Sequence, residues 1–526
     1  MIKKSILAVV ESKYVFYSLL LFNIVLLCFT KFYPSMDGAA HLYNSKILLE
    51  LVKGNPILSE FYTINKLPIP NWTGHFILLL FQSVLPAWIA EKILLILYVA
   101  GMAVSFRYLI KVLNPENTSL SILIFPFIYS FLFHLGFYNF SISFIFFFTS
   151  LGFWLQNNTS TKPYFFITLF LLFILTYFTN LLIFGFLGIT IGFYILYFSY
   201  KEYINNKDFQ ISIKFALKKL GLLLLVSLPG LIFLLIFFAN NQFFPSNQSY
   251  SIKELLKWIN DVRPFIVYDY PDEKIITEQY FHVLLIMLAF SFIRSVNQSA
   301  SKKLLIEKVN IIAIPLILTI LLLFITPNGT GAGMMSDRYC LMLFIFGLIL
   351  IVSRPSRIKI NTIVILIFVV LHIGLLFKHL NGTIKKLDKA AIAINNTEKY
   401  ISENDIVLPI NLSDNWLEPH FSNYLGINKP VIILENYEAS VGWFPVKWNS
   451  ETMPKILLTD KESICGIHWP SNAKSSKNKQ IDFVLLYGNQ EKFNDSKWQE
   501  LRDILSTNFK VKYNSSDNYV LLYERL

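Results

Sequence analysis

Long apolar segments separated by short polar ones dominate the first 380 residues, and this alternation limits the possible folds more than any other feature. A helix needs about 20 mostly apolar residues to cross the roughly 30 Å hydrocarbon core of a bilayer. Backbone polar groups inside that core must be hydrogen-bonded within the protein. The apolar runs therefore predict an α-helical polytopic membrane protein. The expected spans cover residues 14–30, 88–110, 119–134, 137–156, 163–180, 181–200, 215–239, 277–292, 310–326, 339–352 and 361–379.

Composition supports a membrane protein and argues against a nucleic-acid-binding one. The chain is 54% hydrophobic and 15% charged, with a mean hydropathy of +0.52, whereas soluble domains carry about 25% charged residues. The net charge of +12 comes from lysines and arginines between apolar runs, which is where membrane topology requires them. The three cysteines, Cys28, Cys340 and Cys465, are far apart and predict neither a disulfide framework nor a metal motif.

The charges in the connections predict the topology. Basic connections alternate with nearly uncharged or acidic ones, as the positive-inside rule requires. The apolar run at residues 72–86 has only 15 residues, and the alternation is kept only if this run lies along the membrane surface. We therefore expect about eleven spans, with the N-terminus inside.

Two domains are expected from this topology. Residues 1–380 form the transmembrane domain, with a first outer loop at about 31–87 and a long outer loop at about 240–276. Residues 381–526 form a soluble α/β domain on the outer face, whose role the residue chemistry does not reveal. Its strand-like runs are residues 406–410, 430–434, 482–487 and 519–523, and its helix-like run is residues 498–507.

The polar stretch after the first span, residues 34–43, holds the most informative acid, Asp37. An aspartate at the centre of a spanning helix costs about 2.5–3.5 kcal/mol, so Asp37 belongs at a membrane surface. In a helix that starts there, Asp37, His41, Asn44 and Ser45 share one face, with the acid and imidazole exposed. Asp37 could equally be an ordinary helix cap, and the two interpretations are compatible.

Other polar residues, including Arg263 and Arg338, fall on the same predicted outer face. Arginine offers a planar fork that grips phosphate oxygens. A carboxylate such as Asp37 could take a proton from an acceptor hydroxyl or hold a hard divalent cation such as Mg²⁺ or Mn²⁺. Such groups suit a transferase that uses a lipid-phosphate-linked donor. The candidate substrate-binding residues are His75, Asn139, Arg263, Tyr268, Asp269 and Arg338, although Tyr268 could be an interfacial anchor.

The order of these features resembles the glycosyltransferase-C (GT-C) superfold, which includes protein O-mannosyltransferases and lipid A aminoarabinose transferases. The resemblance covers roughly residues 1–380 and implies sugar transfer from a polyprenyl-phosphate donor, with an acid of the first outer loop in the active site. Asp37, within Met36-Asp37-Gly38-Ala39-Ala40-His41, matches that acid. Residues 70–75 are similar to the start of the second surface helix but lack its usual His/Lys-Pro-Pro-Leu form. Gly38 replaces the second acid of the common acidic pair, and Asp269 is the expected substitute.

The sequence thus predicts a glycosyltransferase at the outer face of a bacterial inner membrane, acting on a glycan, lipid or protein acceptor. Asp37 would be the general base or a metal ligand, His41 would assist, and Arg263 and Arg338 would bind the lipid phosphate. The alternatives are a glycan polymerase or ligase that shares the compartment and donor class, a lipid-linked glycan transporter or flippase, and a non-catalytic scaffold. A transporter normally needs polar or broken spans, whereas the spans here are nearly free of charge. In a scaffold, Asp37→Asn would leave function intact.

Overall fold

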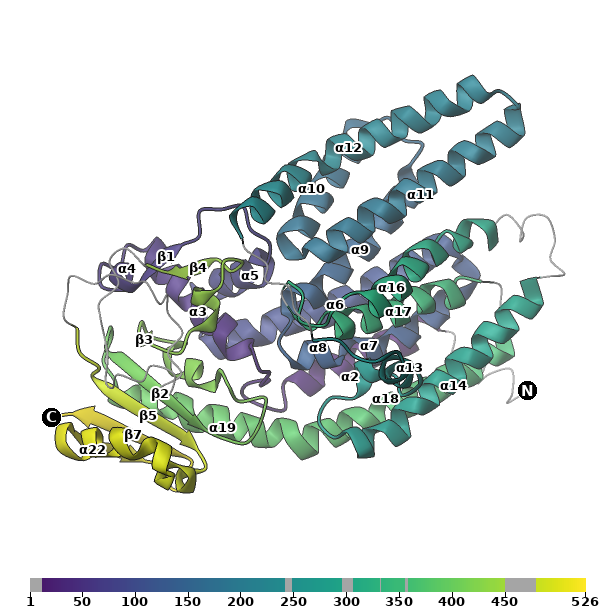
Figure 1. Cartoon of the computed structure of the whole chain (residues 1–526). Helices are drawn as coiled ribbons and strands as arrows, with labels where there is room; N and C mark the ends of the chain where they lie inside the picture. The colour runs from purple at the N-terminus through teal and green to yellow at the C-terminus, as the bar shows by residue number, and fades with distance from the viewer. Residues whose placement is uncertain (1–11, 242–247, 296–305, 332, 355–357, 450–478) are drawn as a thin grey trace. The chain divides into compact units, whose positions relative to one another are not determined.

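The structure, a computed structural model, describes residues 12–241, 248–295, 306–331, 333–354, 358–449 and 479–526 (Figure 1). The chain forms two compact units that interleave in sequence. The first unit comprises residues 1–26, 97–133 and 139–379, and the second comprises residues 27–96, 134–138 and 380–526. Of the three cysteines, Cys28 and Cys340 are free thiols, and Cys465 lies outside the described residues.

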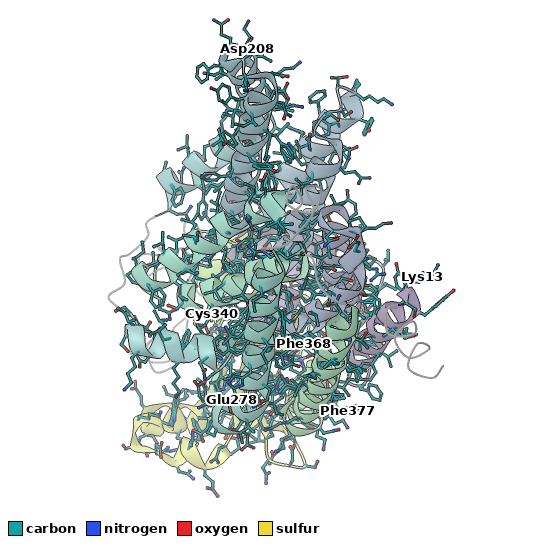
Figure 2. All side chains as sticks on the ribbon, turned by 90° about the vertical axis from the view of Figure 1, so that its right-hand side faces the viewer. Lys13, Asp208, Glu278, Cys340, Phe368 and Phe377 are labelled. Carbon is teal, nitrogen blue, oxygen red and sulfur yellow. The ribbon has the colours of Figure 1, made fainter. Side chains whose placement is uncertain are left out.

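Apolar helices make up most of the first unit. Its helices are α2 (Lys13–Leu27), the second half of α6 (Ala87–Leu113), α9 (Tyr138–Asn157), α10 (Pro163–Thr179), α11 (Leu181–Asn206), α12 (Phe209–Asn240), α13 (Ile252–Asn260), α14 (Tyr270–Ser295), α16 (Ala313–Ile325), α17 (Met335–Val352) and α18 (Ile358–His379). Helices α10, α11 and α12 pack on one another, and α16 packs on α17. Asp208 caps α12 at the turn that joins α11 to α12, at the tip of this helix pair (Figure 2).

Among the described residues, seven helices are long and apolar enough to cross a membrane. Two shorter apolar helices, α2 and α10, lie where two further spans are expected. The prediction of a helical polytopic membrane protein is therefore confirmed, and the number of eleven spans stays a prediction. The seven are Ala87–Leu113, Tyr138–Asn157, Leu181–Asn206, Phe209–Asn240, Ile306–Ile325, Met335–Val352 and Asn361–Tyr400.

The expected span at residues 119–134 is not one continuous helix. This stretch contains the 3-10 helix η1 (Pro115–Ile124) and the short helices α7 (Phe125–Ile128) and α8 (Phe131–His134). Pro126 has no backbone N–H to donate to a continuing α-helix. The Asn117 amide also donates to the backbone carbonyls of Val352 and Arg354, at 2.6 and 2.5 Å, and so ties η1 to the end of α17. These tertiary bonds are invisible to a hydropathy pattern.

A five-stranded mixed sheet forms the C-terminal part of the second unit. Its order is β3-β2-β5-β7-β6, with β2 parallel to β3 and β5, and β7 antiparallel to β5 and β6. Four strands and helix α22 (Gln499–Asn508) confirm the expected α/β pattern, whereas the polar edge strand β6 was not expected. The strands are β2 (Ile406–Leu412), β3 (Ile432–Ile433), β5 (Phe483–Gly488), β6 (Phe509–Asn514) and β7 (Val520–Arg525).

The first polar segment belongs to the same unit as this sheet. It contains α3 (Gly38–Val52), the short α4 (Leu58–Phe61), β1 (Tyr62–Ile64) and α5 (Trp72–Gln82), and β1 pairs antiparallel with β4 (Val446–Trp448). Helix α5 has 11 residues, about 16 Å, too short to span a bilayer. This length agrees with a surface position.

Tyr43 is one of the residues that tie helix α3 to the C-terminal segment. The Tyr43 hydroxyl donates to the Val431 carbonyl at 2.7 Å and accepts from the Ile433 N–H at 2.9 Å. A short helix α19 (Lys385–Asn395) and the 3-10 helix η5 (Phe421–Gly426) also pack in this unit, and η5 contacts α3. Residues nearly 400 positions apart therefore share one core.

Candidate active site

Asp37 is the residue just before α3, but its side chain does not cap that helix. The cap bond comes instead from Ser35, whose Oγ accepts from the Gly38 N–H at 3.1 Å. Only 6% of Asp37 is exposed, and so is only 5% of His41. The cap interpretation is therefore wrong for the carboxylate, and so is the expectation that the acid and imidazole are exposed.

A glycine turn holds the backbone at Asp37. The Asp37 N–H donates to the Leu135 carbonyl at 2.9 Å, and the next residue, Gly136, has a φ of +90°. A Cβ on Gly136 would lie 2.9 Å from the backbone nitrogens of Asp37 and Gly38. This close approach needs both the left-handed conformation and the missing side chain of glycine.

His41, one turn after Asp37, forms a buried cluster with His75 and Glu438. The Nδ1 atom of His41 lies 2.5 Å from Oε1 of Glu438, and the Nε2 atom of His75 lies 2.8 Å from Oε2. All three side chains are at most 6% exposed. The three residues come from α3, from α5 and from the short helix α20 (Tyr437–Ser440).

An amide pair fixes the segment that carries Glu438 against α3. Asn44 and Asn436 each donate their side-chain N–H to the other's amide oxygen, at 3.0 and 2.9 Å. Asn436 also caps α20 by accepting from the Ala439 N–H at 3.3 Å. The predicted polar face of α3 thus binds the C-terminal segment, and Ser45 on that face donates to the His75 carbonyl.

Both histidines are oriented from behind by backbone carbonyls. The His41 Nε2–H donates to the Gly136 carbonyl at 2.9 Å, and the His75 Nδ1–H donates to the Asn71 carbonyl at 3.2 Å. A carbonyl can only accept, so each of these nitrogens carries a proton. The second nitrogen of each ring therefore faces Glu438.

The negative charge of Glu438 and the imidazoles beside it stabilise one another. Burial by itself would raise the pKa of Glu438, but the positive charges and hydrogen bonds of His41 and His75 outweigh it and lower the pKa to about 2. Burial opposes the charged form of His41, and Glu438 and Asp37 together raise the pKa of this imidazole. In the absence of any bound cation, Glu438 is an anion that favours protonated histidine beside it.

The same three residues could hold a metal ion. One ligand atom from each of His41, His75 and Glu438 lies within 4.8 Å of the others. Two imidazoles and one carboxylate are a donor set used by catalytic zinc sites, and ligating histidines normally donate their other N–H to a carbonyl or carboxylate. Asp37 is not part of this set, so the structure places a candidate cation site beside the predicted one.

Asp37 has its own neighbours in the second unit. The Nε2 atom of His420 lies 3.9 Å from Oδ1 of Asp37, and the Tyr437 hydroxyl lies beside the same carboxylate. Burial raises the pKa of Asp37, and the positive charges of His420 and His41 offset this only in part. A carboxyl group with a raised pKa is a suitable proton acceptor from a hydroxyl group.

The two predicted phosphate-binding arginines lie together in the first unit. The Nε atom of Arg263 lies 3.3 Å from Oδ1 of the buried Asp337, and Arg338 is the next residue on α17. The Arg263 guanidinium stacks 3.7 Å from the Phe131 ring centre, and that of Arg338 lies 5.1 Å from the Phe140 ring. The charges of both guanidinium groups act on the one Asp337 carboxylate, which leaves this cluster with excess positive charge.

The remaining predicted residues have local structural roles in the first unit. Exposed Asp269 accepts from the Asp272 N–H at 3.1 Å and so caps α14, and the Tyr268 ring lies 5.0 Å from His379. Asn139 is buried at the start of α9. Within the second unit, the carboxylate whose charge acts on Asp37 is Glu438, which sequence reasoning did not assign.

The sequence-based prediction assigned no role to His420 or to the run Glu435-Asn436-Tyr437-Glu438. Glu435 and Glu438 are 8% and 0% exposed. Acidic residues directly after a strand of apolar residues are the only local signal that could have singled them out. The partners of Glu438 on α3 and α5, His41 and His75, are more than 360 residues earlier in the chain.

Comparison with solved structures identifies the fold. The chain matches the crystal structure of ArnT from Cupriavidus metallidurans bound to undecaprenyl phosphate, with a TM-score of 0.54 and 10% sequence identity. The match covers 98% of this chain and 98% of that chain. This likeness shows the fold, which is the GT-C fold that the sequence resemblance implied. No protein-family model matches the chain, and no curated protein does.

Proposed function

We propose that this membrane protein is a glycosyltransferase that moves a sugar from a polyprenyl-phosphate donor to an acceptor hydroxyl. The observation that carries the proposal is the buried Asp37 carboxylate, which makes no cap bond with its own helix and faces histidine, in a chain with the GT-C fold. Burying a carboxylate costs free energy, and Asp37 does not offset this cost by capping its own helix. We therefore infer that the carboxylate serves the chemistry of the site.

The donor class is supported by the structural neighbour. The matched ArnT structure holds undecaprenyl phosphate, a polyprenyl phosphate. The long apolar helices of the first unit place the protein in a membrane, which is where such a lipid is found. We therefore assign the leaving group of the reaction to this lipid class.

In the proposed reaction, Asp37 removes the proton from the acceptor hydroxyl. The acceptor oxygen forms a bond to the anomeric carbon of the sugar, and the bond from that carbon to the phosphate oxygen breaks. The polyprenyl phosphate leaves with the bonding electron pair, and the proton stays on Asp37 until it passes to solvent. Attack opposite the leaving group inverts the anomeric centre.

Arg263 and Arg338 are proposed to bind the donor phosphate. Each guanidinium already lies against an aromatic ring, and Asp337 holds Arg263 in place. Guanidinium groups bind phosphate oxygens in a bidentate manner, and the excess positive charge of the pair favours an anion.

We place the catalytic groups on the outer face of a bacterial inner membrane, with the N-terminus inside. The alternation of basic and non-basic connections supports this topology. The acceptor on that side would be a lipid-linked glycan, a protein hydroxyl or another surface molecule. A cation held by His41, His75 and Glu438 would stabilise the second unit and lie close to Asp37.

The decisive experiment is sugar transfer by the purified protein in lipid nanodiscs, with a panel of radiolabelled polyprenyl-phosphate sugars. We expect Asp37→Asn to abolish turnover while donor binding is retained, because an amide cannot take the hydroxyl proton. Equal turnover in the variant and the wild type would refute the assignment of Asp37.

A matched control exists in the first unit. Asp208 is also an aspartate at the N-cap of a helix, but its side chain accepts from the Gln210 and Ile211 N–H groups. Because asparagine caps helices about as well as aspartate, Asp208→Asn should keep wild-type turnover. The pair of variants separates the loss of a base from the loss of a negatively charged cap.

A further inference from the structure

The side chains of Glu435, His420 and Asp37 form a line that starts beside the C-terminal sheet. The Nδ1 atom of His420 lies 2.9 Å from Oε1 of Glu435, and its Nε2 atom lies 3.9 Å from Oδ1 of Asp37. His420 immediately precedes η5, and Glu435 follows β3 by two residues. The imidazole thus lies between two carboxylates that are about 400 residues apart in sequence.

Glu435 is held firmly in its position. Its carboxylate accepts from the Asn423 amide at 2.8 Å and from the Ser422 hydroxyl at 3.3 Å. The Asn423 amide also donates to the Glu435 backbone carbonyl at 3.2 Å. A buried carboxylate with this many donors is fixed in one orientation and can fix its own partner.

The hydrogen bond to Glu435 fixes which nitrogen of the His420 imidazole faces Asp37. An ionised carboxylate only accepts, so the Nδ1 atom of His420 carries the proton in their hydrogen bond. Burial opposes the charged form of His420, but the negative charges of Glu435 and Asp37 outweigh this effect and raise the pKa of His420. In the protonated imidazole Nε2 also carries a hydrogen, which is directed at the Asp37 carboxylate. The Tyr437 ring stacks on the imidazole at 4.1 Å between ring centres and restricts its rotation.

Asp37 needs an external group to orient it, because its side chain makes no bond with the start of α3. The other groups that face it are His41, Glu438 and Tyr437. His41 is committed to Glu438 and to the Gly136 carbonyl. His420 is therefore the imidazole with a nitrogen left for Asp37.

We propose that His420, oriented by Glu435, is a positioning residue that holds the Asp37 carboxylate in the orientation required for proton removal from the acceptor. The arrangement matches the logic of a catalytic triad, in which a carboxylate orients a histidine that acts on a third group. This inference rests on the proposed function. It gives the C-terminal α/β segment a defined contribution to the site on α3.

The test is the steady-state kinetics of the full chain in nanodiscs with the donor that the wild type turns over. His420→Ala should lower kcat about 10–100-fold, the usual range for losing an orienting partner, and leave the KM for donor within about two-fold. Added imidazole should restore part of the turnover in His420→Ala and none in Asp37→Asn. His420→Gln, whose amide N–H can reach the position of Nε2, should retain more activity than His420→Ala.

The exposed histidine His282 on α14 provides the control, and His282→Ala should behave as wild type. A folded His420→Ala variant with wild-type kcat would overturn the inference. So would a loss that neither imidazole nor glutamine relieves, since that pattern marks a purely structural residue. If His420→Ala does not fold, Glu435→Gln decides, because wild-type kcat in that variant would also overturn it.

Failure of this inference differs from failure of the proposed function. If Asp37→Asn keeps full turnover, the base assignment itself is wrong. If Asp37→Asn is inactive while His420→Ala is fully active, Asp37 stays the base and only the positioning role of His420 is lost.

Discussion

The Nε2 atom of His75 lies 2.8 Å from Oε2 of Glu438, although 363 residues separate the two in sequence. Both side chains are completely buried, and the other Glu438 oxygen faces His41. The C-terminal segment therefore completes a cluster that starts in the first polar segment.

Removing the Glu438 charge should abolish metal binding. The two-histidine, one-carboxylate donor set suits zinc or manganese better than magnesium, because imidazole is a poor ligand for magnesium. We expect the dialysed wild type to bind zinc or manganese at one site, and Glu438→Gln to lose it, as measured by mass spectrometry of the metal content. A chelator should also lower the thermal stability of the wild type.

The exposed Glu491 offers the control, since Glu491→Gln removes the same charge elsewhere in the second unit. Equal metal content in both variants would contradict the site. Absence of metal from the wild type would leave His41 and His75 as ion-pair and hydrogen-bond partners of Glu438 only.

Gly136→Ala should strain the backbone at residue 136 and, in addition, displace Asp37. A non-glycine residue at φ +90° costs about 1–3 kcal/mol, and the added Cβ would also press on the Asp37 nitrogen at 2.9 Å. We expect lower thermal stability and a marked loss of turnover.

Gly54→Ala separates the two effects. Gly54 has a φ of +81°, but a Cβ there would meet nothing within 4 Å. It should lose stability through strain while turnover stays near that of the wild type. Equal turnover in the Gly136 and Gly54 variants would show that the turn does not hold Asp37.

The pH profile of kcat/KM should show the burial of Asp37. The base must be ionised to work, and burial raises the pKa of Asp37 above its usual 3.8. Activity should therefore fall, as pH is lowered, at a higher pH than an exposed aspartate would give.

His420→Gln should move this acidic limb further upward. The His420 positive charge favours the ionised form of Asp37, opposing the effects of burial and of Glu438, so its removal raises the pKa of Asp37 again. His282→Gln is the matched control. A downward shift in His420→Gln would contradict the described electrostatics.

Arg263→Lys should weaken donor binding without unfolding the protein. Lysine keeps the positive charge beside buried Asp337 but loses the planar fork that grips a phosphate. The binding of undecaprenyl phosphate, measured by its displacement of a labelled lipid, should weaken. The exposed Lys253 lies on the nearby helix α13, and Lys253→Gln should leave binding unchanged. Unchanged binding in Arg263→Lys would remove Arg263 from the phosphate site.

Local patterns were sufficient for most elements. The apolar run at residues 163–180 became α10 (Pro163–Thr179), and the strand-like run at residues 482–487 became β5 (Phe483–Gly488). Both elements were predictable because local composition and hydrophobic periodicity are sufficient to indicate a helix or a strand. The stretch at residues 119–134 is not the one continuous helix expected, and the side chain of Asn117 just before it binds the end of α17, beyond the reach of any local pattern.

The sequence by itself determined the membrane class, most helices and strands, and the placement of Asp37 and His41 one helical turn apart, since these follow from hydropathy and helical spacing. Only the tertiary structure decided that Glu438 joins His41 to His75 and that Glu435 directs His420 at Asp37. The physical reason is that a charged side chain can be buried only beside a compensating partner, and chain folding, not sequence distance, selects that partner.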